Sequence, residues 1–155
     1  MSPRFSTVAD WSARMPSVDP AIDAPGLEID QGWIPGKNLR ERLRRVRSAE
    51  GERFYRTVKV GSGIARVELE DETTKAVFDT LWPLTEGKRV HKRRYRVPDG
   101  ELVWEIDQFL DRELFLAEVE LTREDEAVPL PGWLQPVVVK EVTGDAQYVN
   151  EKLAR

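Results

Sequence analysis

The sequence predicts a mainly β protein of the α+β class, in which eight antiparallel strands close into a barrel, or tunnel, with a few flanking helices. Three observations lead to this prediction. Short segments alternate apolar and charged residues in steps of two, tight-turn signals separate these segments, and one central stretch switches to helical spacing. A closed sheet of about eight strands encloses just enough room for side chains or one small ligand. We expect a single domain over residues 1–155.

The first half of the chain supplies four of the expected strands. Residues 1–25 show little pattern, because three prolines interrupt the chain after a short helical turn over Ser12–Met15. The expected strands cover residues 27–34, 39–47, 53–60 and 64–70. The turn signals between them are Pro35-Gly36, Glu50-Gly51-Glu52 and Gly61-Ser62-Gly63.

A helix is expected over Thr73–Trp82, because apolar residues recur there at helical spacing. Thr73 or Thr74 can cap its start, and Pro83 ends it. Three strands follow at 89–97, 101–110 and 114–121, and Pro98-Asp99-Gly100 marks a hairpin turn. After a proline-containing loop over 128–136, we expect a short strand at 137–142 and a terminal helix at 146–154.

Four of these strands place their charged residues on one face. Successive side chains of a strand point to opposite faces, so residues two apart share a face. The charged faces consist of Arg66, Glu68 and Glu70; of Lys92, Arg94 and Arg96; of Glu105 and Asp107; and of Glu118 and Glu120. If these faces meet inside a closed sheet, the chain encloses a pocket with basic and acidic walls. Such a pocket suits a polyanion bound together with a divalent cation.

The charges are also segregated along the chain. Residues 37–96 carry 17 Lys/Arg against 9 Asp/Glu, whereas residues 101–126 carry 2 Lys/Arg against 10 Asp/Glu. The simpler alternative is a sheet with one solvated face, which also alternates charged and apolar residues, although such a face ordinarily mixes the signs. The basic segment alone would suit nucleic acid, but we rank this partner last because the acidic segment argues against an open basic surface.

Composition excludes several kinds of chemistry. The chain has no cysteine, which excludes disulfides, thiolate catalysis and cysteine-bound metal. It has one histidine, His91, so any metal must be held mainly by oxygen ligands. No run of about 18 apolar residues occurs, so we expect no membrane partner. Met1–Phe5 shows no apolar signal region, and we therefore expect a cytoplasmic protein.

A series of short motifs carries a resemblance to a known family. The motifs are Ile29–Ile34, Arg45-Val46-Arg47, Lys59, Arg66–Glu70, Leu81–Val90, Lys92–Tyr95, Trp104–Asp107, Ala117–Leu121, Glu141–Asp145 and Tyr148–Asn150. Leu81–Val90 closely resembles the same stretch of short bacterial members of the CYTH superfamily, also called triphosphate tunnel metalloenzymes. The other segments, in order, resemble the family's IxQGYL, RxR, lysine, RxExE, KxRY, ExD, AEVEL and EVTxD…YxN motifs. The chain is similar to the short bacterial inorganic triphosphatase-like members over residues 27–153, while residues 1–26 match poorly.

The resemblance implies an eight-stranded tunnel that hydrolyses a triphosphate-containing substrate, inorganic triphosphate or similar, with Mg²⁺ or Mn²⁺. A small triphosphate or polyphosphate is then the expected partner, and the sequence also allows a homodimer. The resemblance implies phosphate binding by Arg4, Arg45, Arg47, Lys59, Arg66, Lys92 and Arg94. It implies metal binding by Glu68, Glu70, Glu118 and Glu120, and catalytic roles for Glu105, Asp107 and Glu120.

The chain departs from the family pattern at its first strand. Family members begin with ExExK, whereas here Arg4-Phe5 aligns with the family's Lys-Phe and Ser2 stands where the second glutamate belongs. The alternative hypothesis is therefore a catalytically impaired CYTH module that binds polyphosphate or nucleotide without the ExExK carboxylates. Trp33 also stands where short members usually have tyrosine, and we expect it to be a packing residue.

Overall fold

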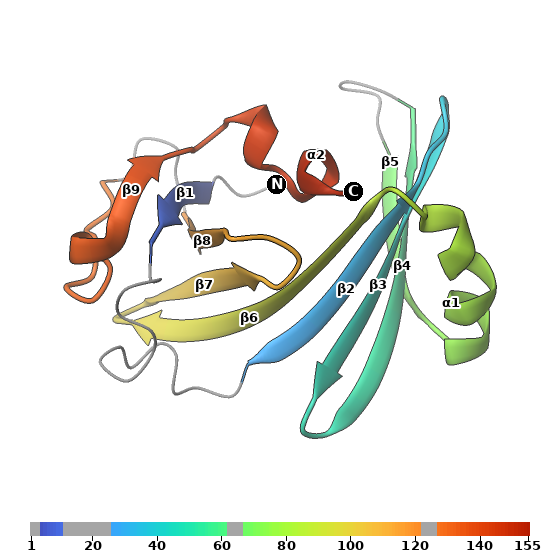
Figure 1. The fold of residues 1–155 in the computed structure, drawn as a ribbon, viewed down its shortest axis with the longest axis horizontal. Helices are drawn as coiled ribbons and strands as arrows, with labels where there is room; N and C mark the ends of the chain where they lie inside the picture. Colours follow the sequence, from blue (N-terminus) through green and yellow to red (C-terminus); the bar gives the residue numbers. More distant parts are fainter. Residues whose placement is uncertain (1–3, 11–25, 62–66, 122–126) are drawn as a thin grey trace. The chain divides into compact units, whose positions relative to one another are not determined.

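A computed structural model of the chain describes residues 4–10, 26–61, 67–121 and 127–155 (Figure 1). Its contacts divide the chain into two compact units, one of residues 1–27 and 92–146 and one of residues 28–91 and 147–155. The first unit contains β1 (Arg4–Ala9), most of β6 (Arg89–Asp99), β7 (Leu102–Phe109), β8 (Phe115–Glu120) and β9 (Val138–Glu141). The second contains β2 (Leu27–Ile34), β3 (Leu39–Ser48), β4 (Gly51–Val60), β5 (Val67–Thr73), α1 (Lys75–Leu81) and α2 (Asn150–Leu153).

The strands form one antiparallel sheet in the order β5-β4-β3-β2-β6-β7-β8-β1-β9. This order is open, with β5 and β9 at its two ends, so the expected closed eight-stranded barrel is wrong. One reason lies in β9, which pairs with the edge of β1 that β8 leaves free. At the other end, β5 exposes Glu68, Glu70 and Glu72, and charged edge strands resist further pairing. The fold is mainly β with few helices, as expected.

In the first unit, the apolar core lies on one face of β1, β6, β7 and β8. Trp104 and Ile106 of β7 are fully buried there, beside Ala117 and Val119 of β8. The ring of Trp104 meets the rings of Phe5 and Trp133 edge-on, at centroid distances of 6.2 and 6.3 Å. The segment after β8 covers this face with Leu134 and Val137. The alternation predicted for β7 and β8, with apolar residues on one face, is confirmed.

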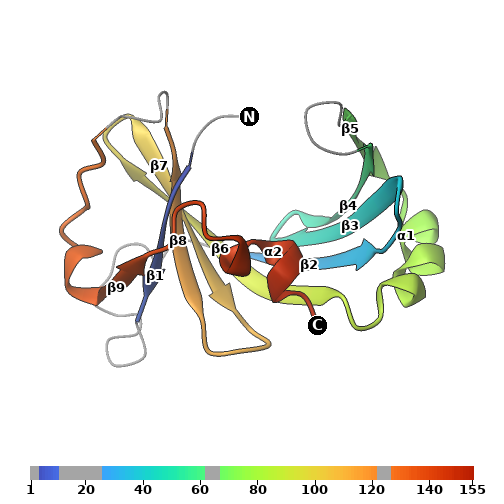
Figure 2. The same cartoon turned by 90° about the horizontal axis from the view of Figure 1, so that it is seen from above.

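In the second unit, α1 packs on one face of the strands β2 to β5. Leu43 of β3 and Phe54 of β4 form a buried cluster with Phe78 of α1. The ring of Phe78 lies 5.1 Å from that of Phe54 and stacks on Trp82 at 4.8 Å. Both views show α1 beside β3 and β4 (Figures 1 and 2). The helix α1 therefore covers one face of these four strands and leaves the opposite face uncovered by α1.

The central helix agrees with its sequence signals. Thr74 is the N-cap of α1, and its hydroxyl accepts a hydrogen bond from the Val77 backbone N–H at 3.2 Å. Pro83 lies in a 3-10 turn, Trp82–Thr85, that follows α1 directly. The expected terminal helix is shorter than predicted: a 3-10 turn over Ala146–Tyr148 precedes the four-residue α2.

Other expectations have mixed outcomes. The residue pattern predicts no strand over Arg4–Ala9, which alternates weakly and forms β1; only the resemblance places Arg4-Phe5 on a first strand. The helical turn expected over Ser12–Met15 lies outside the described residues. The same holds for the last two residues of the expected loop Gly61-Ser62-Gly63. Among the described residues, no helix is long and apolar enough to cross a membrane. The single domain over residues 1–155 stays a prediction.

Candidate functional site

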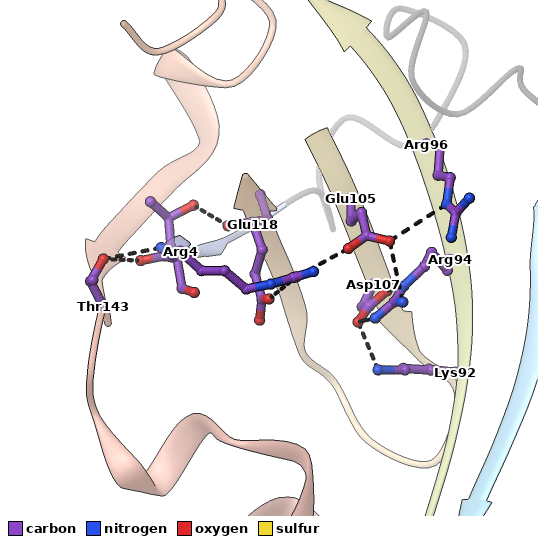
Figure 3. A network of polar contacts seen from close by, with 11 residues as sticks. Arg4, Lys92, Arg94, Arg96, Glu105, Asp107, Glu118 and Thr143 are labelled. Atoms are coloured by element: carbon purple, nitrogen blue, oxygen red, sulfur yellow. Dashed lines mark hydrogen bonds and ion pairs between the residues drawn. The ribbon is translucent and has the colours of Figure 1, made fainter. Parts of the chain in front are cut away.

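The first unit carries a charged face on β1, β6, β7 and β8, opposite its apolar core. Residues directly opposite each other in an antiparallel pair share a face. The register brings four pairs of charged residues onto this face: Arg94 and Asp107, Arg96 and Glu105, Glu105 and Glu118, and Arg4 and Glu120. Figure 3 shows most of these side chains extending toward one another from neighbouring strands. The sequence predicted this grouping, and the backbone pairing produces it.

The most deeply buried charged residues of the face are Lys92 and Asp107. Asp107 is 3% exposed, and Lys92 beside it is 0% exposed. The Lys92 Nζ donates to Asp107 Oδ2 at 2.8 Å, while Arg94 donates from Nε and Nη2 to the two carboxylate oxygens at 2.8 and 3.0 Å. Burial disfavours the carboxylate, but the charge of Lys92 and the hydrogen bonds and charge of Arg94 lower the pKa of Asp107 to about 2. Asp107 is therefore a fixed anion at neutral pH.

A chain of ion pairs runs outward from Asp107. The Arg94 Nη1 lies 3.2 Å from Glu105 Oε2, and the Arg96 Nε lies 3.5 Å from the same oxygen. The Arg4 Nη1 donates to Glu105 Oε1 at 3.1 Å and to Glu118 Oε2 at 3.0 Å. Arg4 thus links two carboxylates that face each other across β7 and β8.

These contacts favour the charged forms of the residues. Burial acts against the charge on Arg94, yet its contacts with Asp107 and Glu105 raise its pKa. Burial likewise acts against the charge on Glu105, but the charge of Arg94 and the hydrogen bond from Arg4 lower its pKa. The pKa of Arg4 is raised against the effect of burial by its hydrogen bonds to Glu105 and Glu118. The face consequently presents fixed charges of both signs.

The second unit has its own charged face, on the side of the strands opposite α1. The register pairs Lys59 with Arg40 on β3 and with Glu68 on β5. The same alternation places Arg42, Arg44 and Glu70 on this side. The Arg42 Nη2 donates to Thr57 Oγ1 at 3.2 Å and lies 3.6 Å from Glu70 Oε1. The Arg44 Nε donates to Gln31 Oε1 at 2.6 Å.

A hollow of about 290 Å³ lies on this charged face of the second unit. Arg44 and Tyr55 line it together with Glu70, Asp71 and Glu72. Basic residues of β3 therefore lie beside acidic residues of β5 within one unit. This neighbourhood contains Lys59, Glu68 and Glu70 of the predicted site residues, while Arg66 lies outside the described residues.

Arg45 and Arg47 lie on the other face, the one covered by α1. The Arg45 guanidinium donates to Asp30 Oδ2 from Nε and Nη2, at 3.1 and 2.8 Å, and sits over the ring of Phe78 at 5.5 Å. Arg47 lies 3.5 Å from Glu28 and 3.4 Å from Glu52. The structure therefore does not bring these two arginines together with Lys59, and their role in phosphate binding stays a prediction.

β3 contains two RxR motifs besides Arg45-Val46-Arg47, and one of them, Arg42-Leu43-Arg44, has both arginines on the face of Lys59. The signal that identifies it is the hairpin between β3 and β4, in which Ser48 pairs with Gly51. Antiparallel pairing then sets Arg42 opposite Thr57 and Arg44 opposite Tyr55, so both share the face of Lys59. The intervening Leu43 is 0% exposed and points to the α1 side.

Comparisons with known proteins agree with this architecture. No family model matches the chain. An inorganic triphosphatase from Nitrosomonas europaea is 38% identical over 137 residues, which cover 83% of this chain and 84% of that protein. The chain belongs to the CYTH superfamily of triphosphate tunnel metalloenzymes. An inorganic triphosphatase from Acetivibrio thermocellus is 32% identical over 139 residues, which cover 85% of this chain and 83% of the relative.

Solved structures support the same assignment of this CYTH chain. The crystal structure of the inorganic triphosphatase NE1496 has a TM-score of 0.73 and 28% identity, covering 99% of this chain and 94% of that one. A Pyrococcus horikoshii protein, PH1819, has a TM-score of 0.53 at 17% identity, covering 81% of this chain and 80% of that one. At such low identity, the second likeness concerns the fold alone.

The charged face of the first unit, as far as the structure describes it, offers a metal ion two neighbouring carboxylates and no complete set of protein ligands. Among the residues that the structure describes, no three acidic or histidine side chains are grouped to hold an ion by themselves. Glu105 and Glu118 nevertheless lie opposite each other and share a cation, the Arg4 guanidinium. Mg²⁺ is usually bound through one or two carboxylates, with water and substrate phosphates completing its shell. The pair therefore fits an ion that arrives with a polyphosphate.

The buried position of Asp107 leads to a testable pH dependence. A pKa lowered to about 2 from the ordinary 3.8 means that Asp107 contributes stability fully above about pH 4 and loses it as the pH falls through about 2. Asp107→Asn should lower the free energy of unfolding near neutral pH by about 3–5 kcal/mol, because it leaves the buried Lys92 charge without its partner. It should also reduce the loss of stability between about pH 4 and about pH 2.

Urea unfolding at several pH values measures both effects. Glu101→Gln, which changes an exposed carboxyl in the turn between β6 and β7, is the control and should keep the acid dependence of the wild type. An equally steep loss of stability in Asp107→Asn and in the wild type would contradict the role assigned to Asp107.

Proposed function

We propose that the chain hydrolyses inorganic triphosphate, or a similar small triphosphate-containing compound, with a divalent metal ion such as Mg²⁺ or Mn²⁺. The observation that carries this proposal is the charged face of the first unit, where arginines and carboxylates of four strands converge. Support comes from the two relatives with 38% and 32% identity, both named inorganic triphosphatases. The proposed substrate carries several negative charges, which the arginines of this face can neutralise.

In the proposed mechanism, the arginines hold the phosphoryl groups. Arg94 is fixed by its two hydrogen bonds to Asp107, so its position costs no reorganisation when substrate binds. Arg96 is 63% exposed and can turn toward a phosphate. Glu105 and Glu118 would hold the metal ion, which would supply positive charge to neutralise the transition state. Water then attacks the terminal phosphorus, the bridging P–O bond breaks, and orthophosphate and diphosphate leave without a covalent enzyme intermediate.

The predicted catalytic residues take different parts in this proposal. Both carboxylate oxygens of Asp107 are occupied by Lys92 and Arg94 and its pKa is about 2, so it is a poor proton acceptor. We assign it the positioning of Arg94. Glu120 is exposed and shares the face of Glu118. We assign to Glu120 the orientation of the attacking water and the acceptance of its proton.

We also propose phosphate binding by the basic face of the second unit, with Arg42 and Arg44 in place of Arg45 and Arg47. The support for this choice is the register of the sheet, which places Arg42 and Arg44 on the face of Lys59. Arg45 instead pairs with the carboxylate of Asp30 at 2.8 Å, on the face covered by α1.

A second candidate function is the binding of polyphosphate or nucleotide without hydrolysis. The observation that favours it is that Glu105, Asp107 and Glu118 each already have a cationic partner on the charged face. Ser2, which stands where the second ExExK glutamate belongs, motivates the same hypothesis, but it lies outside the described residues. That nucleic acid is an unlikely partner and that a homodimer is possible both stay predictions from the sequence.

The first test is release of orthophosphate from inorganic triphosphate. With Mg²⁺ or Mn²⁺, the wild type should turn over, and Glu120→Gln should lower kcat by on the order of 10²-fold, because the attacking water loses its proton acceptor. Glu101→Gln, an exposed glutamate in the β6–β7 turn, is the matched control. Binding of triphosphate measured by calorimetry without any turnover would favour the second candidate function, and absence of both binding and turnover would exclude the two proposals.

The second test compares two RxR motifs of β3, Arg42-Leu43-Arg44 and Arg45-Val46-Arg47, whose arginines lie on opposite faces of the strand. Replacing Arg42 and Arg44 together by glutamine should raise KM for triphosphate by on the order of a hundredfold, since each of the two lost charged hydrogen bonds to phosphate is worth roughly 1.5–3 kcal/mol. The same change at Arg45 and Arg47 should raise it much less. Thermal melting of both variants separates binding from folding, because Arg45 pairs with Asp30. An equal or larger effect at Arg45 and Arg47 would refute the placement.

A further inference from the structure

Glu105 and Glu118 are held together by a cation that belongs to the protein itself. The register sets the two glutamates directly opposite each other on β7 and β8. Like charges in this arrangement repel unless a cation lies between them. One nitrogen, the Arg4 Nη1, contacts both carboxylates at 3.1 and 3.0 Å (Figure 3). The guanidinium thus does in this structure what a divalent ion would otherwise do.

Arg4 can be released more easily than the other arginine beside Glu105. Its side chain is 43% exposed, whereas that of Arg94 is 13% exposed and is tied to the buried Asp107 by two hydrogen bonds. The β1 backbone next to Arg4 is anchored independently, because the Ser6 N–H donates to Thr143 Oγ1 at 3.0 Å. The side chain of Arg4 can therefore move while its strand stays in place.

We propose that Arg4 exchanges with a divalent ion between Glu105 and Glu118 when a polyphosphate binds. The inference rests on the proposed function and adds to it the coupling of the two ligands. Polyphosphate oxygens draw the Arg4 guanidinium into paired hydrogen bonds, as guanidinium forks do with phosphate. The two carboxylates, left facing each other, then take up the ion that accompanies the polyphosphate.

Two consequences follow for binding. Without polyphosphate, a divalent ion must displace Arg4 from both carboxylates, so the wild type binds the ion weakly. Removing the guanidinium removes this competition, so a variant without it binds the ion more tightly. In the wild type, polyphosphate raises the affinity for the ion and the ion raises the affinity for polyphosphate by the same factor, because coupling between two ligands is reciprocal. In the variant without the guanidinium, this factor should be smaller.

Titration with Mn²⁺ alone, followed by the electron paramagnetic resonance signal of the free ion, tests the proposal without any turnover. Arg4→Gln should bind Mn²⁺ on the order of tenfold more tightly than the wild type. Arg4→Lys, which keeps a cation, should stay near the wild type. Arg96→Gln is the matched control: it removes one positive charge 3.5 Å from Glu105 but none from between the two glutamates. It should tighten Mn²⁺ binding far less.

Tight Mn²⁺ binding by the wild type in the absence of polyphosphate would overturn the inference, and so would unchanged Mn²⁺ affinity in Arg4→Gln. Equally tightened Mn²⁺ binding in Arg96→Gln would also overturn it, because it would indicate a general charge effect. Arg4→Met, which keeps an unbranched stem, replaces Arg4→Gln if thermal melting shows that variant to be unfolded. Phosphate release by the wild type is measured separately. If the wild type hydrolyses triphosphate while the Mn²⁺ titrations fail, the exchange is refuted and the proposed function stands.

Discussion

The charged face of the first unit depends on one buried interaction, the ion pair of Asp107 with Lys92 and Arg94. Two charges as deeply buried as those of Lys92 and Asp107 are tolerated only when each has a close partner. Asp107 meets this condition by using both of its oxygens, and in doing so it fixes the guanidinium of Arg94. Arg94 then contacts Glu105, which in turn contacts Arg4. The buried ion pair thereby fixes the positions of Arg94, Glu105 and Arg4 on the face of the sheet.

The period of two along each strand connects this array to the core. In β7, Trp104 and Ile106 fill the apolar side, while Glu105 and Asp107 occupy the opposite side. The same alternation along β7 therefore places apolar residues in the core and charged residues on the opposite face. In the second unit, α1 covers one face of β3, so the arginines of that strand are divided between a packed side and a side without α1.

The sequence predicted most of the charged face, because β6, β7 and β8 each contain a clear alternation with unambiguous parity. The sequence predicted the strand β3 but left its faces undecided, because arginines at 40, 42, 44, 45 and 47 occur at both parities. Only the hairpin register, with Ser48 opposite Gly51, decides which of them accompany Lys59. A shift of one residue moves every side chain of a strand to the other face.

Other features were beyond the reach of local patterns. Whether a sheet closes depends on which strands pair at its ends, and β9 pairs with β1 through only a few residues of weak alternation. The depth of Lys92 was also not visible in the sequence, since its motif suggested a phosphate contact whereas the structure buries it against Asp107 and near the ring of Phe109. Strand parity gives the face of a residue but not its burial.

A crystal structure of the full chain with Mn²⁺ and diimidotriphosphate, a triphosphate analogue with nitrogen in both bridging positions, tests the central claim most directly. The account predicts that oxygens of the analogue contact Arg94 or Arg96, that the anomalous signal of Mn²⁺ lies beside Glu105 and Glu118, and that Lys92 and Asp107 remain paired with each other. An analogue bound away from this face, or to Arg45 and Arg47 on the α1 side of β3, would contradict it.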